Sequence, residues 1–321
     1  MKTLTQNRKP VTDGQKKLII RMIGDVADSD PVQEAINALS TKGAEQVKGN
    51  PEFVESLQQF AVRRIGELGT VNDFANEEVA CKYGYFSGYK PGVQDLDRQI
   101  GALQAQFPGL GGANTNLLGK IKSGEITLPK GAEKFFAVVN RKKHPQIFGA
   151  TYSQAVQTVL DVLEMTRNGA FQNYRKGKID EAHLCQSARS EQFWDELAKE
   201  QGDADILIIA AQFGKRHGGR SVRRARIVIE DTSGETGLGA FVVGCMLLTH
   251  PERLQNLNDL WVDLPGDEFA PGADGVFSWS PVFYWDDGRL GFASSDVDFA
   301  FGVYFGSASG FPPQYPCTSK T

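Results

Sequence analysis

Apolar residues recur every three or four positions through much of the first 170 residues, which is the spacing of amphipathic helices. The clearest example follows Thr151, where five apolar residues fall on one helical face and Gln154 stands three positions after the threonine. This Thr-x-x-Gln order is typical of a capping box, which satisfies the free N–H groups of a first helical turn. The same periodicity is found at residues 15–26, 32–39, 53–61 and 93–107. The sequence therefore predicts a mainly helical N-terminal region.

The pattern changes in the second half of the chain. Residues 206–211 are continuously apolar, as expected of a strand that is buried on both faces. Residues 226–229 are a second, shorter strand candidate, and 238–248 form an apolar run whose glycine-containing entry and His-Pro exit favour a helix. Aromatic-rich runs then alternate with turns, and the dipeptide Asp287-Gly288 between two of them predicts a hairpin.

These elements predict an α+β fold, in which an N-terminal helical region is followed by a mixed, largely antiparallel β-rich region. We place the boundary at residue 170, so that 1–170 is mainly helical and 171–321 contains the sheets. The charged stretch 180–200 is expected to be helical, with Leu184 and Trp194 among its buried side chains. Turn-forming glycines and prolines mark the loops between the predicted elements.

The composition is typical of a globular protein, with 321 residues of which 40% are hydrophobic and 23% charged. Its longest apolar runs fall well short of the ~18 residues of a membrane-spanning helix, so we expect no membrane partner. The polar, basic start of the sequence is not followed by an apolar segment, which predicts a cytoplasmic protein. The four cysteines occur singly, so neither a disulfide scaffold nor a structural zinc site is expected.

The net charge of −4 conceals an uneven distribution along the chain. Residues 1–229 contain 32 basic and 26 acidic residues, whereas residues from Glu230 onward contain 3 basic and 13 acidic residues. The two parts therefore carry charges of +6 and −10. Such an asymmetry indicates either a surface for an anionic partner or two parts of the chain that complement each other, within one subunit or between subunits.

One stretch, residues 215–226, contains six Lys or Arg residues and no acidic residue. Arginine presents a planar fork of donors suited to phosphate, and the glycines at 218 and 219 permit close backbone approach. We therefore predict that this basic loop binds an anionic partner, with nucleic acid or another phosphate-bearing ligand as the leading candidate. The residues expected to contact the anion are Lys215, Arg216, His217, Arg220, Arg223, Arg224 and Arg226. The alternative is a surface loop that the acidic, aromatic-rich C-terminal part neutralises.

Two smaller basic groups lie in the middle third of the chain, at 141–144 and 175–178. Each has aromatic residues nearby in the sequence that could stack on bases. They extend the same hypothesis of a phosphate or nucleic-acid contact surface, and the alternative for both is an ordinary solvated face.

A second hypothesis concerns the carboxylates Asp263, Asp267 and Glu268, which lie close together in the sequence around a predicted turn. If they converge, they could bind Mg²⁺ or Mn²⁺ in a hydrolase or transferase acting on a phosphorylated substrate, with Arg220 or Arg223 holding the phosphate. The alternative is that they are ordinary surface residues of turns between strands.

Three functions therefore stay open. The leading hypothesis is non-enzymatic binding of an anionic partner through the basic loop, and the second is the metal-dependent enzyme. The third is a self-assembling structural protein, a homo-oligomer in which the basic part of one subunit contacts the acidic part of the next. The sequence contains no Gly-x-Ser-x-Gly nucleophile motif and no P-loop, so it assigns no catalytic residue.

Overall fold

A computed structural model describes residues 73–90, 95–272, 274–298 and 302–314. The chain divides into two compact units, residues 1–66 and 67–321, and the described residues all belong to the second. The helices expected at 15–26, 32–39 and 53–61 lie outside the described residues.

The predicted α+β class is confirmed, with seven α-helices and eleven strands in the described part of the chain. The helices are α5 (Leu96–Gln106), α6 (Thr115–Lys122), α7 (Pro145–Phe148), α8 (Tyr152–Thr166), α9 (Ala188–Glu200), α10 (Val222–Asp231) and α11 (Ala240–Thr249). The strands are β1 (Lys134–Val139), β2 (Phe171–Asn173), β3 (Leu184–Gln186), β4 (Ile206–Gln212), β5 (Thr236–Gly237), β6 (Trp261–Asp263), β7 (Asp267–Phe269), β8 (Trp279–Asp286), β9 (Arg289–Asp296), β10 (Phe305–Ser307) and β11 (Ser309–Phe311). Helices are more frequent in the earlier half of this region, and strands in the later half.

The first sheet has four strands in the order β1-β4-β11-β5. The continuously apolar run at 206–211 is the central strand β4, and every residue of that strand is buried. Its antiparallel partner β1 was not predicted, although Phe136 to Val139 are aromatic, small or branched residues that pack well in a buried strand. Gln99 of α5 covers the outer edge of β1, since its side chain bonds Phe135 O and Ala137 N. Because β1 precedes residue 170 and β4 follows it, the two sides of that boundary share one sheet.

The second sheet has seven strands in the order β10-β6-β8-β7-β3, with β9 paired to β8 and β2. Most of its pairings are antiparallel, and two, β10 with β6 and β2 with β9, are parallel. The hairpin predicted at Asp287-Gly288 connects β8 to β9, and both turn residues have positive φ, at 48° and 74°. Those angles are typical of the type I′ turn that Asp-Gly favours.

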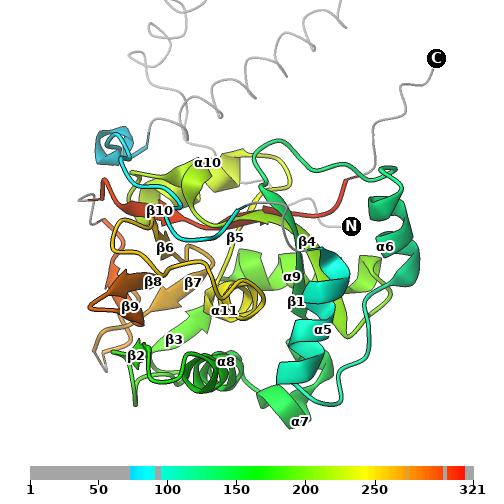
Figure 1. The fold of residues 1–321 in the computed structure, drawn as a ribbon. Coiled ribbons are helices and arrows are strands. Elements are labelled where there is room, and N and C mark those ends of the chain that lie inside the picture. The colour runs from blue at the N-terminus through cyan, green and yellow to red at the C-terminus, as the bar shows by residue number, and fades with distance from the viewer. Residues whose placement is uncertain (1–72, 91–94, 273, 299–301, 315–321) are drawn as a thin grey trace, which may run out of the picture. The chain divides into compact units, whose positions relative to one another are not determined.

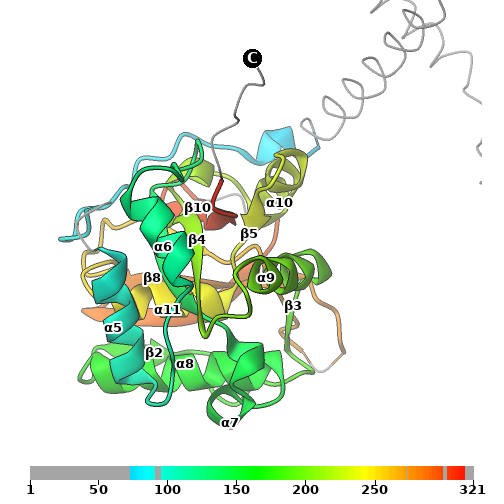
Figure 2. The same ribbon diagram turned by 90° about the vertical axis from the view of Figure 1, so that its right-hand side faces the viewer.

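Helix α11 occupies the core, as its uniformly apolar sequence predicted. Figures 1 and 2 show it between α10 at one side of the described part and α8 at the opposite side. Gly244 lies against Val159 of α8 so closely that a side chain there would collide with the valine. The absence of a Cβ at this position therefore sets the close approach of α8 and α11. None of the described helices is long and apolar enough to cross a membrane.

Two local predictions were wrong. Residues 226–229, expected as a strand, lie inside α10, because Ser221 caps that helix by accepting a hydrogen bond from Arg224 N and the buried residues recur at helical spacing. The stretch 180–200 is helical only from Ala188, where Ser187 provides the cap. Its earlier part contains β3, which pairs with β7 of the second sheet.

Candidate functional site

The basic loop predicted at 215–226 consists of the short helix η3 (Lys215–His217), a glycine turn and the first half of α10. Four of its arginines form ion pairs with carboxylates from distant parts of the chain. The pairs are Arg216 with Glu235, Arg220 and Arg224 with Glu78, and Arg223 with both Glu77 and Asp298. Arg226 donates to the carbonyl oxygens of Pro265 and Asp267 at 3.0 and 2.6 Å. These side chains connect separate segments of the fold.

Glu235 is the centre of the buried part of this network. Its carboxylate accepts hydrogen bonds from His217 Nε2 at 2.8 Å, Ser309 Oγ at 2.5 Å and Arg216 Nε at 3.0 Å. Because Arg220 Nη1 donates to His217 Nδ1 at 3.0 Å, the network assigns a neutral imidazole with its proton on Nε2. Burial lowers the pKa of His217. Burial is the largest single influence on Glu235 and opposes its ionisation, but the hydrogen bonds from His217, Ser309 and Arg216 and the electrostatic influence of His217 together outweigh burial, so the pKa of Glu235 is lowered.

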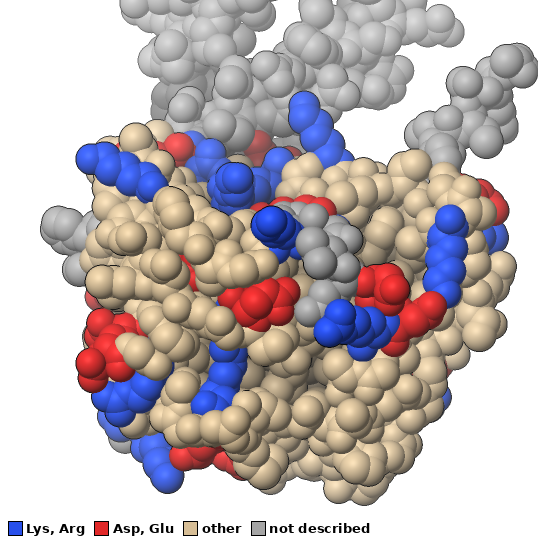
Figure 3. Space-filling view, in the orientation of Figure 1, with Lys and Arg blue, Asp and Glu red and all other residues tan. Residues whose placement is uncertain are grey.

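A second cluster joins α10 to the residues that precede α5. Glu77 and Arg224 are only 6% and 5% exposed, and Arg224 pairs with Glu78. Of the six cations, Lys215 and Arg226 have no ion pair in the described residues; Arg226 donates to carbonyl oxygens, and Lys215 Nζ lies 5.9 Å from the ring centroid of Tyr85. On the face shown in Figure 3, Lys and Arg side chains lie beside Asp and Glu side chains. Binding of nucleic acid by the basic loop stays a prediction, and its arginines have protein partners.

The three predicted metal ligands lie in different surroundings. Asp267 accepts a hydrogen bond from the Tyr152 hydroxyl at 2.6 Å, and Glu268 from the thiol of Cys185 at 3.7 Å. As consecutive residues of β7, Asp267 and Glu268 point to opposite faces of the sheet. Asp263 is buried in β6, where burial raises its pKa to about 8. Among the described residues no group of three or more His, Cys, Asp or Glu side chains could hold a metal ion, so the predicted Mg²⁺ or Mn²⁺ site is not formed.

A different cation, Arg141, lies without a carboxylate partner in the described part of the chain. Strand β1 leads directly into the short helix η2 (Arg141–Lys143), which places Arg141 beside α8 and β3. The guanidinium carbon lies 4.9 Å from the ring centroid of Tyr152, and Nη2 donates to Gln186 Oε1 at 3.2 Å. The ring and the amide therefore orient the guanidinium group and leave further N–H donors uncommitted.

Arg141 lines a pocket of about 370 Å³. A recess of about 30 Å³ adjoins it and shares Arg141, Lys142, Tyr152 and Gln186 with it. This recess extends to Trp194 of α9, whose indole Nε1 is buried and finds no hydrogen-bond partner in the described part of the chain. The recess is thus lined by the Trp194 N–H, which has no acceptor among the described residues, and by Arg141, which has N–H donors beyond the one bonded to Gln186.

The other side of the pocket carries negative charge. Lys142 pairs with Glu191 at 2.8 Å and Asp195 at 2.7 Å. Although burial opposes its charged form, the hydrogen bonds to these carboxylates raise the pKa of Lys142. Ser153 donates to Glu181 at 3.1 Å on the same wall. The pocket therefore combines one cation that forms no ion pair within the described residues with a rim that contains carboxylates.

The first residues of α8, Tyr152 and Ser153, form part of the wall together with residues 149–150, which precede the helix. The capping box predicted at Thr151 is confirmed. The Tyr152 hydroxyl is committed to Asp267, and burial raises the pKa of Asp267 to about 7. Tyr152 consequently contributes its ring to the pocket, where it contacts the Arg141 guanidinium group, while its hydroxyl is bonded to Asp267.

Sequence reasoning singled out 141–144 as a basic group but could not separate Arg141 from its neighbours. Lys143 and His144 both face Asp205, with distances of 2.6 and 3.1 Å. The spacing of charges along the chain shows none of these pairings. The sequence analysis expected Trp194 to be buried. Nothing in the sequence indicated that its indole N–H would lack a partner in the described residues.

Comparisons of the chain with protein-family models, with curated proteins and with solved structures found no match. The chemistry assigned to the Arg141 pocket therefore follows from its geometry.

Proposed function

We propose that this protein binds a small anion, a carboxylate or a phosphate ester, in the Arg141 pocket. The observation that supports this function is the pair of donors in one hollow, the Arg141 guanidinium and the Trp194 indole N–H, neither of which has a carboxylate partner in the described residues. A buried donor without an acceptor costs about 1–3 kcal/mol, and a bound anion would remove that cost. The function is thus anion binding, at a position other than the basic loop.

The pocket also favours particular features of the ligand. A guanidinium fork binds carboxylate or phosphate through two parallel hydrogen bonds, and the Tyr152 ring fixes the plane of the Arg141 fork. A volume of about 370 Å³ suits a small organic molecule. Because Glu181 and Glu191 line the same pocket, the ligand we expect also carries hydroxyl or ammonium groups that can donate to them.

The test is isothermal titration calorimetry of the full chain with inorganic phosphate, small phosphate monoesters and small hydroxy- and amino-carboxylates. We expect at least one of these anions to saturate the protein. Arg141→Ala should weaken that binding more than about tenfold, because a charge-assisted bidentate contact is lost. Trp194→Phe keeps the ring but removes the N–H, and should weaken binding by about fivefold, the value of one hydrogen bond.

Arg98→Ala is the matched control, since Arg98 is an exposed arginine on α5. It should bind as the wild type does. If no anion saturates the protein, or if Arg141→Ala binds with wild-type affinity, the proposed function is wrong.

Nucleic-acid binding by the basic loop is the second candidate, because the side chain of Arg223 is 36% exposed despite its ion pairs. Fluorescence anisotropy with single- and double-stranded oligonucleotides at low salt separates the two sites. Binding that is lost in Arg220→Ala/Arg223→Ala and kept in Arg141→Ala would place the anionic partner at the loop. Binding of phosphate esters but not of oligonucleotides would favour the pocket.

A further inference from the structure

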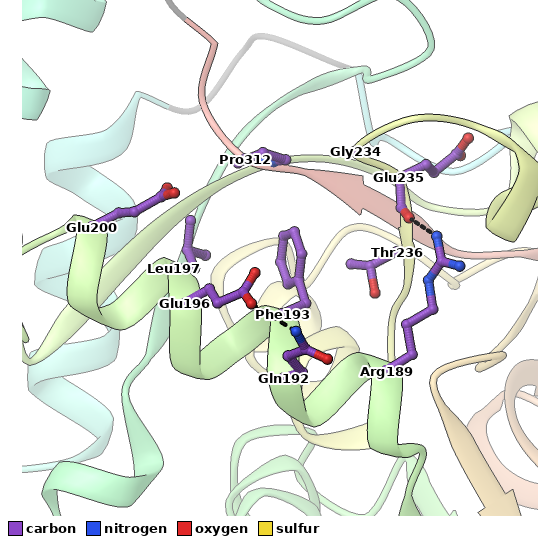
Figure 4. Close-up of a pocket in the computed structure, with 10 residues that line it drawn as sticks. All are labelled: Arg189, Gln192, Phe193, Glu196, Leu197, Glu200, Gly234, Glu235, Thr236 and Pro312. Carbon is purple, nitrogen blue, oxygen red and sulfur yellow. Dashed lines mark hydrogen bonds between the residues drawn. The ribbon is translucent and has the colours of Figure 1, made fainter. Parts of the chain in front are cut away.

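A second pocket, of about 340 Å³, lies between α9 and the segment that leads into β5 (Figure 4). It shares no lining residue with the Arg141 pocket or its recess. One wall is formed by residues 234–236 and Pro312, and the other by the face of α9 that carries residues 189–200. It is thus a separate candidate site with its own chemistry.

The floor of this pocket is apolar. Leu197 is 2% exposed, and the Phe193 ring is held by an edge-to-face contact with Trp194 at 5.4 Å between centroids. Together with Pro312 these side chains offer a surface against which a chain of methylene groups can pack. The Phe193 ring also provides a face that attracts a cation.

Two carboxylates, Glu196 and Glu200, stand above this floor. They are four residues apart on α9, so they occupy the same face of the helix. Neither has an ion-pair partner among the residues that the structure describes, and Glu196 accepts one hydrogen bond from Gln192 Nε2 at 2.8 Å. Figure 4 shows both side chains on the pocket side of α9, whereas the carboxylate of Glu235 points away from the pocket.

Thr236 gives independent evidence for a ligand. This residue is 2% exposed, and its hydroxyl has no hydrogen-bond partner among the residues that the structure describes. It lines the pocket, and in Figure 4 the hydroxyl points toward α9 between Phe193 and Arg189. The neighbouring Arg189 donates to the carbonyl oxygen of Glu235 at 3.1 Å and to those at the end of α10, and not to the Thr236 hydroxyl. A hydroxyl buried without a partner is a site at which a ligand donor is favoured.

We propose that this pocket binds a primary ammonium group on an aliphatic chain, as found in a polyamine or in the side chain of lysine. An ammonium group has three donors, and the pocket offers two carboxylates and one hydroxyl as acceptors. The aliphatic chain packs along Phe193 and Leu197. The charge on the ligand is opposite to that expected for the Arg141 pocket, so the two sites take different molecules or different groups.

Calorimetric titration of the full chain with spermidine and, separately, with Nα-acetyl-lysine methylamide tests the proposal. We expect saturable binding of at least one amine. Glu196→Gln/Glu200→Gln should weaken it about tenfold, since two charge pairs are removed. Glu164→Gln, which removes an exposed carboxylate from α8, is the matched control and should bind normally.

Thr236→Val provides a second readout. Because it removes an unpartnered buried hydroxyl, it should leave the unfolding midpoint unchanged or raise it, and yet it should weaken amine binding about threefold. Tighter binding of spermidine would identify a polyamine site, and tighter binding of the lysine derivative a site for a partner's side chain. Failure of both amines to saturate at about 10 mM, a concentration that detects even weak sites, or wild-type affinity in the double variant, overturns the proposal. Arg141→Ala should bind amines normally, so this result is separable from the proposed anion function.

Discussion

The basic loop at 215–226 and the Arg141 pocket differ in the groups that contact their cations. The loop has six Lys or Arg residues, and four of its arginines are ion-paired. Arg141 belongs to a smaller basic group, yet it is held by a ring and an amide and not by a carboxylate. A high density of charge in this sequence therefore corresponds to a high density of ion pairs in the fold, whereas we propose that the anion binds at Arg141, a cation with no ion pair in the described residues.

Burial explains why the loop's most buried charged groups are paired. A charge removed from water must be paired and hydrogen-bonded, or it strongly destabilises the folded state. Glu235 and Arg224 are 2% and 5% exposed, so their partners are requirements of the fold. Arg141 is partly exposed, and its charge remains solvated without a carboxylate.

Among the changes that test this difference, we expect removal of the Glu235 carboxylate to lower the free energy of unfolding most. Glu235→Ala leaves His217, Arg216 and Ser309 without their shared acceptor, and should lower the free energy of unfolding by about 3 kcal/mol or more. Urea denaturation followed by circular dichroism measures the loss. Lys215→Ala, in the same loop but without an ion pair in the described residues, should change stability by less than about 0.5 kcal/mol. Equal stability of the two variants would show that the network around Glu235 is dispensable.

The fold was predictable wherever a local signal determined it. The apolar run of β4, the capping box of α8 and the Asp-Gly turn between β8 and β9 each fix a short element from its own residues. Strand β1 was missed although its aromatic and branched residues suit a strand, whereas the three residues of β3 form a strand only through pairing with β7. The run 226–229 has strand-like composition, but the Ser221 cap and its helical packing decide its conformation.

The candidate site was less predictable for the same reason. The charge asymmetry at Glu230 suggested that the acidic part neutralises the basic loop, and Glu235 and Asp298 do so. Glu77 and Glu78, which pair with the other arginines of the loop, come from the part of the chain counted as basic. Pairings between residues more than a hundred positions apart depend on the tertiary structure, and composition cannot identify them.

A change of pH should alter the free energy of unfolding through Asp267, the carboxyl that holds Tyr152 beside the Arg141 pocket. Burial raises the pKa of Asp267 to about 7, while in the unfolded chain the carboxyl titrates near its usual value. Unfolding between those two pH values releases a proton, so this group lowers the free energy of unfolding as pH rises, by up to about 1.4 kcal/mol per pH unit. Asp267→Asn should make the dependence of stability on pH less steep over this window, and Asp263, whose pKa burial raises to about 8, should account for part of the slope that remains. Urea unfolding at several pH values measures the slope.

Asp161→Asn is the control for this measurement, because Asp161 is exposed on α8. It should give the wild-type slope. A wild-type slope in Asp267→Asn as well would contradict the assignment of a raised pKa to that carboxyl.

Removal of the unpaired arginine should affect stability far less than removal of Glu235. Arg141→Ala loses one hydrogen bond and one ring contact, and should cost less than about 1 kcal/mol of unfolding free energy. A bound phosphate ester or carboxylate should raise the melting temperature of the wild type and leave that of Arg141→Ala unchanged. Differential scanning calorimetry with and without the anion measures both quantities. A loss as large as that of Glu235→Ala would instead assign Arg141 to the structural network.

Added salt should have the smallest effect and should act on the two regions differently. Salt screens charges that face solvent, whereas buried pairs are screened much less. Raising NaCl from about 0.05 to about 0.5 M should therefore weaken anion binding at Arg141 severalfold, while the stability difference between Glu235→Ala and the wild type stays nearly constant. Calorimetric titrations and urea unfolding at both salt concentrations supply the two numbers. The opposite result, a stability difference that falls with salt and anion binding that does not, would contradict both assignments. It would mean that the ion pairs of the loop face solvent and that the Arg141 charge is shielded from it.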